Sequence, residues 1–447
     1  MSKIEVNAIE PQCGTTLTIG ASDTSIAGIG TVNWDTTKKT TAFTAVSGRG
    51  YFVDTTSAAI TVTLPASPSA GDIVGVSDYA QTARTNNITI ARNGSNIQGN
   101  ATDLDIQRNG AALTLLYVDA TKGWIVVLTG DEEESKPITQ FITATGGTIT
   151  TSGDFKIHTF TGPGTFCVTC GGNSLGSNTV DYLVVAGGGS GGTASNGDAA
   201  GGGGAGGARM SSGAASGCYT ASPLGACVSA LGVSAQAYPI TVGGGGSASV
   251  HPPGCTTSNP GNRGSNSVFS TITSTGGGAG QQRSSSNPTG PGGSGGGGGR
   301  WNTSTTFTGN TPPVSPPQGN NGGLAQGPTS RNAGGGGGAS AVGGTASGCA
   351  AGAGGAGISN SITGSPIAYA GGGGGGGVNI PGCGVTGAPG AGGTGGGGAG
   401  GGNPGDSGGA GTANTGGGSG GASAAIGANF TSNAGGSGVV IIRYKYQ

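Results

Sequence analysis

Charged and aromatic side chains are both scarce in this chain. Of its 447 residues, 8% are charged and 5% are aromatic, and the formal net charge is −1. Proteins that bind nucleic acids usually carry clustered Lys and Arg residues with aromatic residues between them. No cluster of that kind occurs in the sequence, so we expect no nucleic-acid partner. Few aromatic residues also leave little large apolar surface to bury.

The chain also lacks a long apolar run. The stretch Val439–Ile442 is far shorter than the ~18 residues that a membrane-spanning helix needs. The opening residues, MSKIEVNAIEPQ, contain no apolar segment of the kind found in signal peptides. These absences lead us to expect that the protein folds in the cytoplasm of the cell that makes it.

Motifs for metal binding and catalysis are missing as well. The pair Cys167-x-x-Cys170 has no second pair at ligand spacing, and only two histidines are present, His158 and His251. We interpret the two cysteines as small side chains in or beside a strand, and His158 as a hydrogen-bonded strand residue. There is no Gly-Lys-Ser/Thr loop, and neither histidine stands in a nucleophile-elbow context. We therefore expect no metal, no cofactor and no enzymatic activity.

Glycan cleavage stays open as a minor alternative, because paired carboxylates are what that reaction needs. Four acids lie among the expected strands: Asp54, Asp72, Asp103 and Asp105. Enzymes that cleave glycans usually carry more carboxylates and aromatic residues than this chain has. The sequence therefore favours a protein without catalysis.

Glycine is the residue that the chain has in excess. It occurs 107 times, whereas its usual share is about 7% of residues. Residues 1–135 contain ordinary amounts, and nearly all of the excess follows Val185. This change in composition is the main domain boundary.

The N-terminal part alternates apolar and polar residues with a period of two, which is typical of β-strands. Clear examples are Ile60–Leu64, Asn87–Arg92, Leu113–Val118 and Gly123–Leu128. Asn93-Gly94 and Asn109-Gly110 are residue pairs that tight hairpin turns favour. No convincing helical period is present, so the fold class is all-β. We expect these parts in chain order: an attachment segment 1–50, a β-module 51–130, an acidic linker 131–140, a β-strand module 141–186 and a glycine-rich domain 187–447.

The glycine runs are either a flexible linker or an ordered framework. Gly/Ser linkers behave as random coils, but here apolar strand-like stretches interrupt the runs, and a strong β-strand, Gly438–Gln447, ends them. Collagen is excluded, because the glycines are consecutive and have no Gly-X-Y period. We expect packed polyglycine II helices, in which chains without Cβ atoms bond to neighbours on every side. Gly387–Gly402 would span about 50 Å if it ran straight.

Several stretches of the sequence resemble tail fibres and adhesins of tailed bacteriophages. The glycine-rich domain of those proteins resembles Ala144–Thr161 (ATGGTITTSGDFKIHTFT), Asp181–Gly189 (DYLVVAGGG) and Gly438–Tyr444 (GVVIIRY). The stretch Leu64–Val74 (LPASPSAGDIV) is similar to β-modules of the same fibres, and Met1–Asn7 to fibre starts of marine phages. The resemblance implies a virion protein, assembled in the host cytoplasm and usually three-fold, so we expect a homotrimer. It also implies attachment to other tail proteins through the N-terminus, and variable loops that bind a host-surface glycan or outer-membrane protein.

Receptor contacts should come from the loops between glycine runs, because glycine offers only backbone. The loops with the most suitable side chains are Ala208–Tyr238, Ser247–Asn262 and Arg300–Arg331. The candidate contact residues are Tyr219, His251, Trp301, Phe307 and Tyr369. Two alternatives stay open. Trp301 and Phe307 would only cap the end of the bundle, or the whole chain is a structural fibre shaft or capsid-decorating fibre that binds no receptor.

Overall fold

The computed structural model describes residues 32–128, 138–217, 219–251, 259–282, 290–326, 331–378, 387–402, 406–424 and 429–447. The chain divides into two compact units, residues 1–138 and 139–447, which we call the N-terminal unit and the glycine-rich unit. The described residues are almost entirely strand and extended chain, as the sequence predicts for an all-β protein. The short 3₁₀ turn η2 (Pro223–Gly225) is the one helical element among them.

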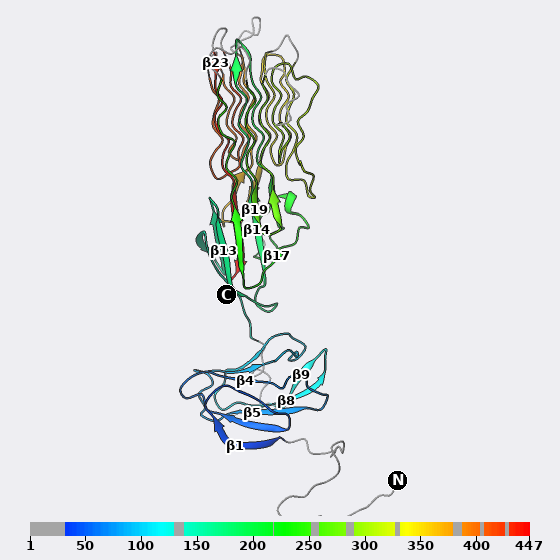
Figure 1. The fold of residues 1–447 in the computed structure, drawn as a ribbon, viewed down its shortest axis with the longest axis vertical. Coiled ribbons are helices and arrows are strands. Elements are labelled where there is room, and N and C mark those ends of the chain that lie inside the picture. The colour runs from blue at the N-terminus through cyan, green and yellow to red at the C-terminus, as the bar shows by residue number, and fades with distance from the viewer. Residues whose placement is uncertain are drawn as a thin grey trace, which may run out of the picture. The chain divides into compact units, whose positions relative to one another are not determined.

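The N-terminal unit consists of two sheets whose strands alternate along the chain. Its strands are β1 (Asn33–Lys39), β2 (Phe43–Thr44), β3 (Arg49–Val53), β4 (Ile60–Thr63), β5 (Ile73–Asp78), β6 (Ile88–Ala91), β7 (Leu104–Ile106), β8 (Ala112–Asp119) and β9 (Gly123–Leu128). One sheet has the order β1-β3-β5-β8-β9 and the other β2-β4-β6-β7 (Figure 1). The first three strands of each sheet are parallel, and antiparallel strands complete both sheets.

The core of the N-terminal unit lies between these two sheets. Alternate residues of each strand point inward, as the period of two predicts, so that residues such as Val53, Val62, Val76 and Ile90 are fully buried. The first strand begins at Asn33, so part of the expected attachment segment 1–50 belongs to the β-module. Residues 1–31 and 131–137 of the expected attachment segment and linker lie outside the described residues.

The glycine-rich unit begins with a β-sandwich. Its strands are β10 (Ile142–Thr145), β11 (Thr148–Ser152), β12 (Phe155–Phe160), β13 (Gly164–Gly171), β14 (Thr179–Val185), β15 (Ala194–Ser195), β16 (Ala208–Met210), β17 (Leu231–Gly232), β18 (Ala237–Thr241), β19 (Ser267–Phe269), β20 (Ile272–Ser274), β21 (Ile358–Asn360), β22 (Ile367–Tyr369), β23 (Asn429–Phe430) and β24 (Val439–Lys445). Sheet β10-β13-β18-β19-β20 faces sheet β11-β12-β24-β14-β16 across a core rich in aromatic residues. Strand β17 pairs with β14.

The segment 141–186 is therefore part of the glycine-rich unit and not a separate module. Its last strand, β14, pairs antiparallel with β24, the final strand of the chain, from Asp181 opposite Arg443 to Val185 opposite Val439. The two ends of the glycine region thus meet in one sheet. This pairing closes the glycine region back on itself.

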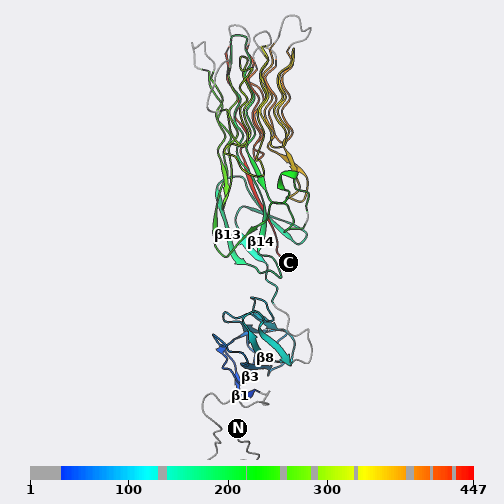
Figure 2. The same ribbon diagram turned by 90° about the vertical axis from the view of Figure 1, so that its right-hand side faces the viewer.

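Beyond the sandwich, the glycine segments form a hydrogen-bonded lattice. Figures 1 and 2 show them running back and forth side by side away from the sandwich. In the run Gly201–Gly207, every third amide donates to the same neighbouring segment, and three residues is the period of a polyglycine II helix. Three of the seven bond to segment 275–281, namely Gly201→Gln281, Gly204→Gly278 and Gly207→Thr275. The others bond in the same way to two further segments, as in Gly202→Gly334, Ala205→Gly337, Gly203→Ser419 and Gly206→Gly416.

The carbonyl groups of the same run accept hydrogen bonds from three more segments. Examples are Gly189→Gly204, Gly297→Gly202 and Gly373→Gly203. The helix 201–207 therefore has six neighbouring segments, and its backbone polar groups are satisfied without any β-ladder. A Cβ atom on Gly203 would lie 2.1 Å from the Gly189 carbonyl oxygen, and one on Gly336 would lie 2.0 Å from that of Gly203. The absence of side chains is what allows the helices to approach so closely.

The longest glycine run does not extend straight. A turn at Thr394–Gly396 reverses it, with Gly395 and Gly396 at φ values of +100° and +94°. The two arms lie side by side, because Gly400 donates to Gly390 at 2.8 Å. The run 387–402 is thus a hairpin of two short helices and does not reach the length of about 50 Å that a straight run would have.

Candidate recognition surface

The glycine lattice exposes few side chains, and a group of polar and aromatic ones lies where its helices turn. We call this end, opposite the sandwich, the distal end. It is marked by the β15–β23 pair, with Ala194 opposite Phe430 (Figure 1). Residues 196–198 form a turn there, in which Asn196 and Gly197 adopt positive φ. A second turn begins at Arg300, whose amide donates to the Ala199 carbonyl.

An ion pair joins these two turns. The Arg300 guanidinium binds the Asp198 carboxylate, and the side chains are only 11% and 2% exposed. The guanidinium carbon of Arg300 also lies 4.8 Å from the ring centroid of Trp301. Trp301 is 39% exposed, and Arg331 donates to the Gly197 carbonyl at 3.3 Å. The distal end therefore presents an indole ring packed on the arginine of a buried ion pair, and a second arginine bound to the 196–198 turn.

This arrangement is suited to binding rather than to catalysis. A tryptophan stacked on a fixed guanidinium loses little conformational freedom when a partner covers it. Trp and Arg are also the residue types that most often dominate the energetics of interfaces. Among the described residues, no group of three or more His, Cys, Asp or Glu side chains is arranged to hold a metal ion.

Trp301 is the one residue of the five sequence candidates that is exposed. His251 also lies at the distal end, because Ser249 in the same segment pairs with Ser432 near β23, but His251 is only 7% exposed. Phe307 is 4% exposed and packs over Gly290, where a Cβ atom would lie 2.1 Å from its ring. Phe307 is therefore a packing residue of the lattice, which corrects its assignment as a contact residue.

Tyr219 and Tyr369 lie at the other end of the lattice, beside the sandwich. Both pack in the hydrophobic cluster formed with Leu183 and Met210. Burial raises the pKa of Tyr369 to about 12 and holds the pKa of Tyr219 well above its usual range. Their rings stabilise the base of the lattice and do not form a contact surface. Cys218 lies outside the described residues, and Cys227 is a free thiol.

Two residues of the distal end were not among the sequence candidates. Asp198 lies in a glycine-rich turn of a chain with few charged residues. Its charge in such surroundings was the one feature of the sequence that could have marked it as a site residue. Arg331 closes the predicted loop Arg300–Arg331, but its contact with Gly197 joins segments that are far apart in the sequence. Contacts of this kind depend on which glycine segments are neighbours.

The acids weighed for glycan cleavage are all engaged in local structure. Asp54 pairs with Lys38, and Asp72 accepts a hydrogen bond from the Ser47 hydroxyl. Asp103 accepts one from the Arg92 amide, and Asp105 accepts one from the Thr89 hydroxyl. Each of these four acids therefore has a structural contact within the N-terminal unit. No helix among the described residues is long and apolar enough to cross a lipid bilayer.

The lattice and sandwich correspond to a known family. Residues 159–445, more than half of the chain, match the family described as "Glycine-rich domain". The chain belongs to this family. The match begins within β12 and ends at Lys445, so the glycine-rich domain includes the sandwich strands that close the lattice. A search of curated proteins gives no match to the chain.

Proposed function

We propose that this chain is a tail-fibre protein of a tailed bacteriophage and that its distal end binds a receptor on the host surface. The observation that carries the proposal is the contrast between the lattice and its end. The lattice offers backbone alone, whereas the distal end presents Trp301 on the Arg300–Asp198 ion pair. The chain enters and leaves the lattice through β14 and β24, so the distal end lies at the other end of the lattice from these strands.

The cysteine chemistry agrees with a protein that works outside cells. Cys349 is disulfide-bonded, and disulfides form and persist mainly in oxidising environments. A virion fibre is assembled in the host cytoplasm and meets such an environment after release. The proposal assigns no catalytic activity to the chain. It also includes attachment to other tail proteins through the N-terminal residues, and a homotrimeric state.

Adsorption of virions that carry single substitutions tests the proposal. Trp301→Ala and Arg331→Ala should each reduce adsorption by about tenfold or more, because each removes a contact of the kind that dominates interfaces. Ile149→Ala is the control, since Ile149 in β11 is a similarly exposed apolar residue (45% against 39%) away from the distal end. Electron microscopy establishes that the particles are intact.

The purely structural alternative predicts a different outcome. If intact particles with both Trp301→Ala and Arg331→Ala adsorb like the parent, the distal end does not bind the receptor. The chain would then be a fibre shaft or a capsid-decorating fibre. Tyr219→Ala would not test adsorption, because the Tyr219 ring packs 5.3 Å from the buried Arg443 guanidinium and the variant would disturb the base of the lattice.

A further inference from the structure

The outer face of one sheet in the N-terminal unit carries a row of aromatic side chains. Alternate residues of a strand share a face, so the residues between the inward-pointing Tyr51, Val53, Val74 and Val76 point outward. The outward residues of three neighbouring strands are Trp34, Thr36 and Lys38 from β1, Gly50 and Phe52 from β3 with Asp54 after it, and Gly75 and Ser77 from β5 with Tyr79 after it.

Two glycines let the Trp34 ring lie flat on this face. A Cβ atom on Gly50 would be 2.6 Å from the ring atom Cδ2, and one on Gly75 would be 3.3 Å from Cη2. Phe52 stacks beside Trp34, with ring centroids 5.0 Å apart and planes inclined by 30°. Tyr79 follows at 6.4 Å from Phe52. Trp34 and Tyr79 are 37% and 56% exposed, so the row is open to solvent.

A pair of opposite charges borders the row. The Lys38 ammonium lies 2.7 Å from an Asp54 carboxylate oxygen and 5.3 Å from the centre of the Tyr79 ring. The second Asp54 oxygen accepts from the amide of Thr56 at 3.1 Å and from its hydroxyl. Hydrogen bonds from Lys38 and Thr56 lower the pKa of Asp54 to about 2, so its carboxylate stays charged at all physiological pH values.

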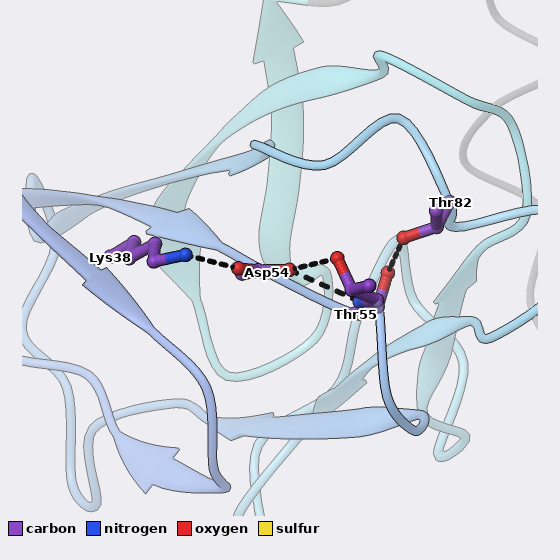
Figure 3. A network of polar contacts seen from close by, with 5 residues as sticks. Lys38, Asp54, Thr55 and Thr82 are labelled. Atoms are coloured by element: carbon purple, nitrogen blue, oxygen red, sulfur yellow. Dashed lines mark hydrogen bonds and ion pairs between the residues drawn. The ribbon is translucent and has the colours of Figure 1, made fainter.

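The backbone around this pair is held in place. Figure 3 shows Lys38 and Asp54 pointing toward each other, with Thr55 bonded to Thr82 next to them. The Thr55 and Thr82 hydroxyl oxygens are 2.8 Å apart, and the Tyr79 amide donates to the Val53 carbonyl at 2.9 Å. The rings and charges therefore keep a fixed spacing before any ligand arrives.

We propose that this face, which we call the aromatic platform, binds a neutral saccharide. The faces of sugar rings present C–H groups that pack on aromatic rings, and the rows of hydroxyls at their edges bond to charged side chains. Trp34, Phe52 and Tyr79 provide the packing surface, while Lys38 donates and Asp54 accepts at one end. The two charges cancel, so the platform suits an uncharged glycan better than an acidic one. This site lies outside the glycine-rich domain and is independent of the distal end.

Tryptophan fluorescence of the full chain tests the proposal. The probes are soluble neutral oligosaccharides, namely maltoheptaose, chitohexaose and xylohexaose, titrated to millimolar concentration. At least one of them should change the emission with saturation. Trp34→Ala and Tyr79→Ala should each weaken binding by about tenfold, measured by calorimetry, as expected for the loss of one aromatic contact. Lys38→Met should weaken it as well.

Val127→Ala is the control and should bind the oligosaccharide like the parent, because Val127 is an exposed apolar residue (47%) of β9, at the opposite edge of the same sheet from β1. Oligosaccharide binding is measured on the isolated protein and adsorption on virions, so a failure of the platform can be told from a failure of the distal end. No binding of any probe, or equal binding by Trp34→Ala, would overturn the platform. A parent oligomer that dissociates on Trp34→Ala would overturn it too, because the face would then be an interface between copies.

Discussion

A single methyl group in the centre of the lattice should destabilise the glycine-rich unit severely. Gly203 is the test position, because its helix is surrounded by six others. Its amide donates to the Ser419 carbonyl at 2.8 Å, and its carbonyl accepts from Gly373 at 2.9 Å. In Gly203→Ala the new Cβ would lie 2.1 Å from the Gly189 oxygen and 2.6 Å from the Gly189 carbonyl carbon. A neighbouring helix must therefore move by about 1 Å, since an ordinary contact needs more than about 3 Å.

The cost follows from three effects. Overpacking by one methyl group costs about 1–3 kcal/mol in a core of side chains. Movement of the helix also strains the two hydrogen bonds, worth about 0.5–1.5 kcal/mol each. The lower entropy of an unfolded chain with alanine offsets about 0.4–1 kcal/mol of this loss. We expect the free energy of unfolding of the glycine-rich unit to fall by about 2–4 kcal/mol.

Differential scanning calorimetry of the full chain measures this change. The control is Gly244→Ala, a substitution in another glycine run, where a Cβ atom would meet nothing within 4 Å. The control should melt like the parent, and Gly203→Ala should melt well below it. If Gly203→Ala melts with the parent, the close-packed lattice is wrong and the linker interpretation returns.

Three further predictions concern the sandwich and the assembly. Burial holds the pKa of His158 below its ordinary value of 6.5, while its ring contacts the Tyr444 hydroxyl at 3.1 Å. As the pH falls, the unfolded chain therefore takes up a proton at a higher pH than the folded chain does. The free energy of unfolding should fall below about pH 6.5, by at most about 1.4 kcal/mol per pH unit. His158→Gln should remove this slope. Asp181→Asn should cost about 2–4 kcal/mol in urea unfolding, because the buried carboxylate accepts from Ser211 Oγ at 2.6 Å and from Ser216 N and Oγ at 2.8 and 2.6 Å, and an unchanged midpoint would contradict this. Light scattering should give the mass of a trimer, and a stable monomer in mild buffer would refute the trimeric state.

The strands were largely predictable from the sequence, whereas their partners were not. The alternating stretch Ile60–Leu64 became β4 and Leu113–Val118 became β8, because a period of two fixes which residues are buried. That period says nothing about strand direction. Asn93 and Gly94 do adopt positive φ, but they do not form a two-residue hairpin, because β7, the antiparallel partner of β6, begins only at Leu104. Both ring nitrogens of His158 are hydrogen-bonded, which confirms its interpretation as a hydrogen-bonded strand residue.

The glycine lattice was predictable as a state but not as an arrangement. Consecutive glycines without a collagen period leave few ordered options, so packed polyglycine II helices follow from composition. A glycine has no side chain that could specify its neighbour, so the sequence does not tell which runs adjoin. For that reason the contact of Arg300 with Asp198 and the burial of Tyr369 both escaped prediction. Composition alone did indicate that side chains suited to binding, such as the exposed Trp301, lie between the glycine runs.

Amide hydrogen exchange across Gly201–Gly207 tests most directly the claim that the glycine region is a rigid framework for a recognition surface. All seven amides of this run donate to carbonyls of other segments, at distances of 2.8 to 3.2 Å. The account predicts that they exchange at least about a thousandfold more slowly than amides of an unstructured glycine peptide, as slowly as those of β14 and β24. Exchange of these seven amides at the rate of the unstructured peptide would contradict it.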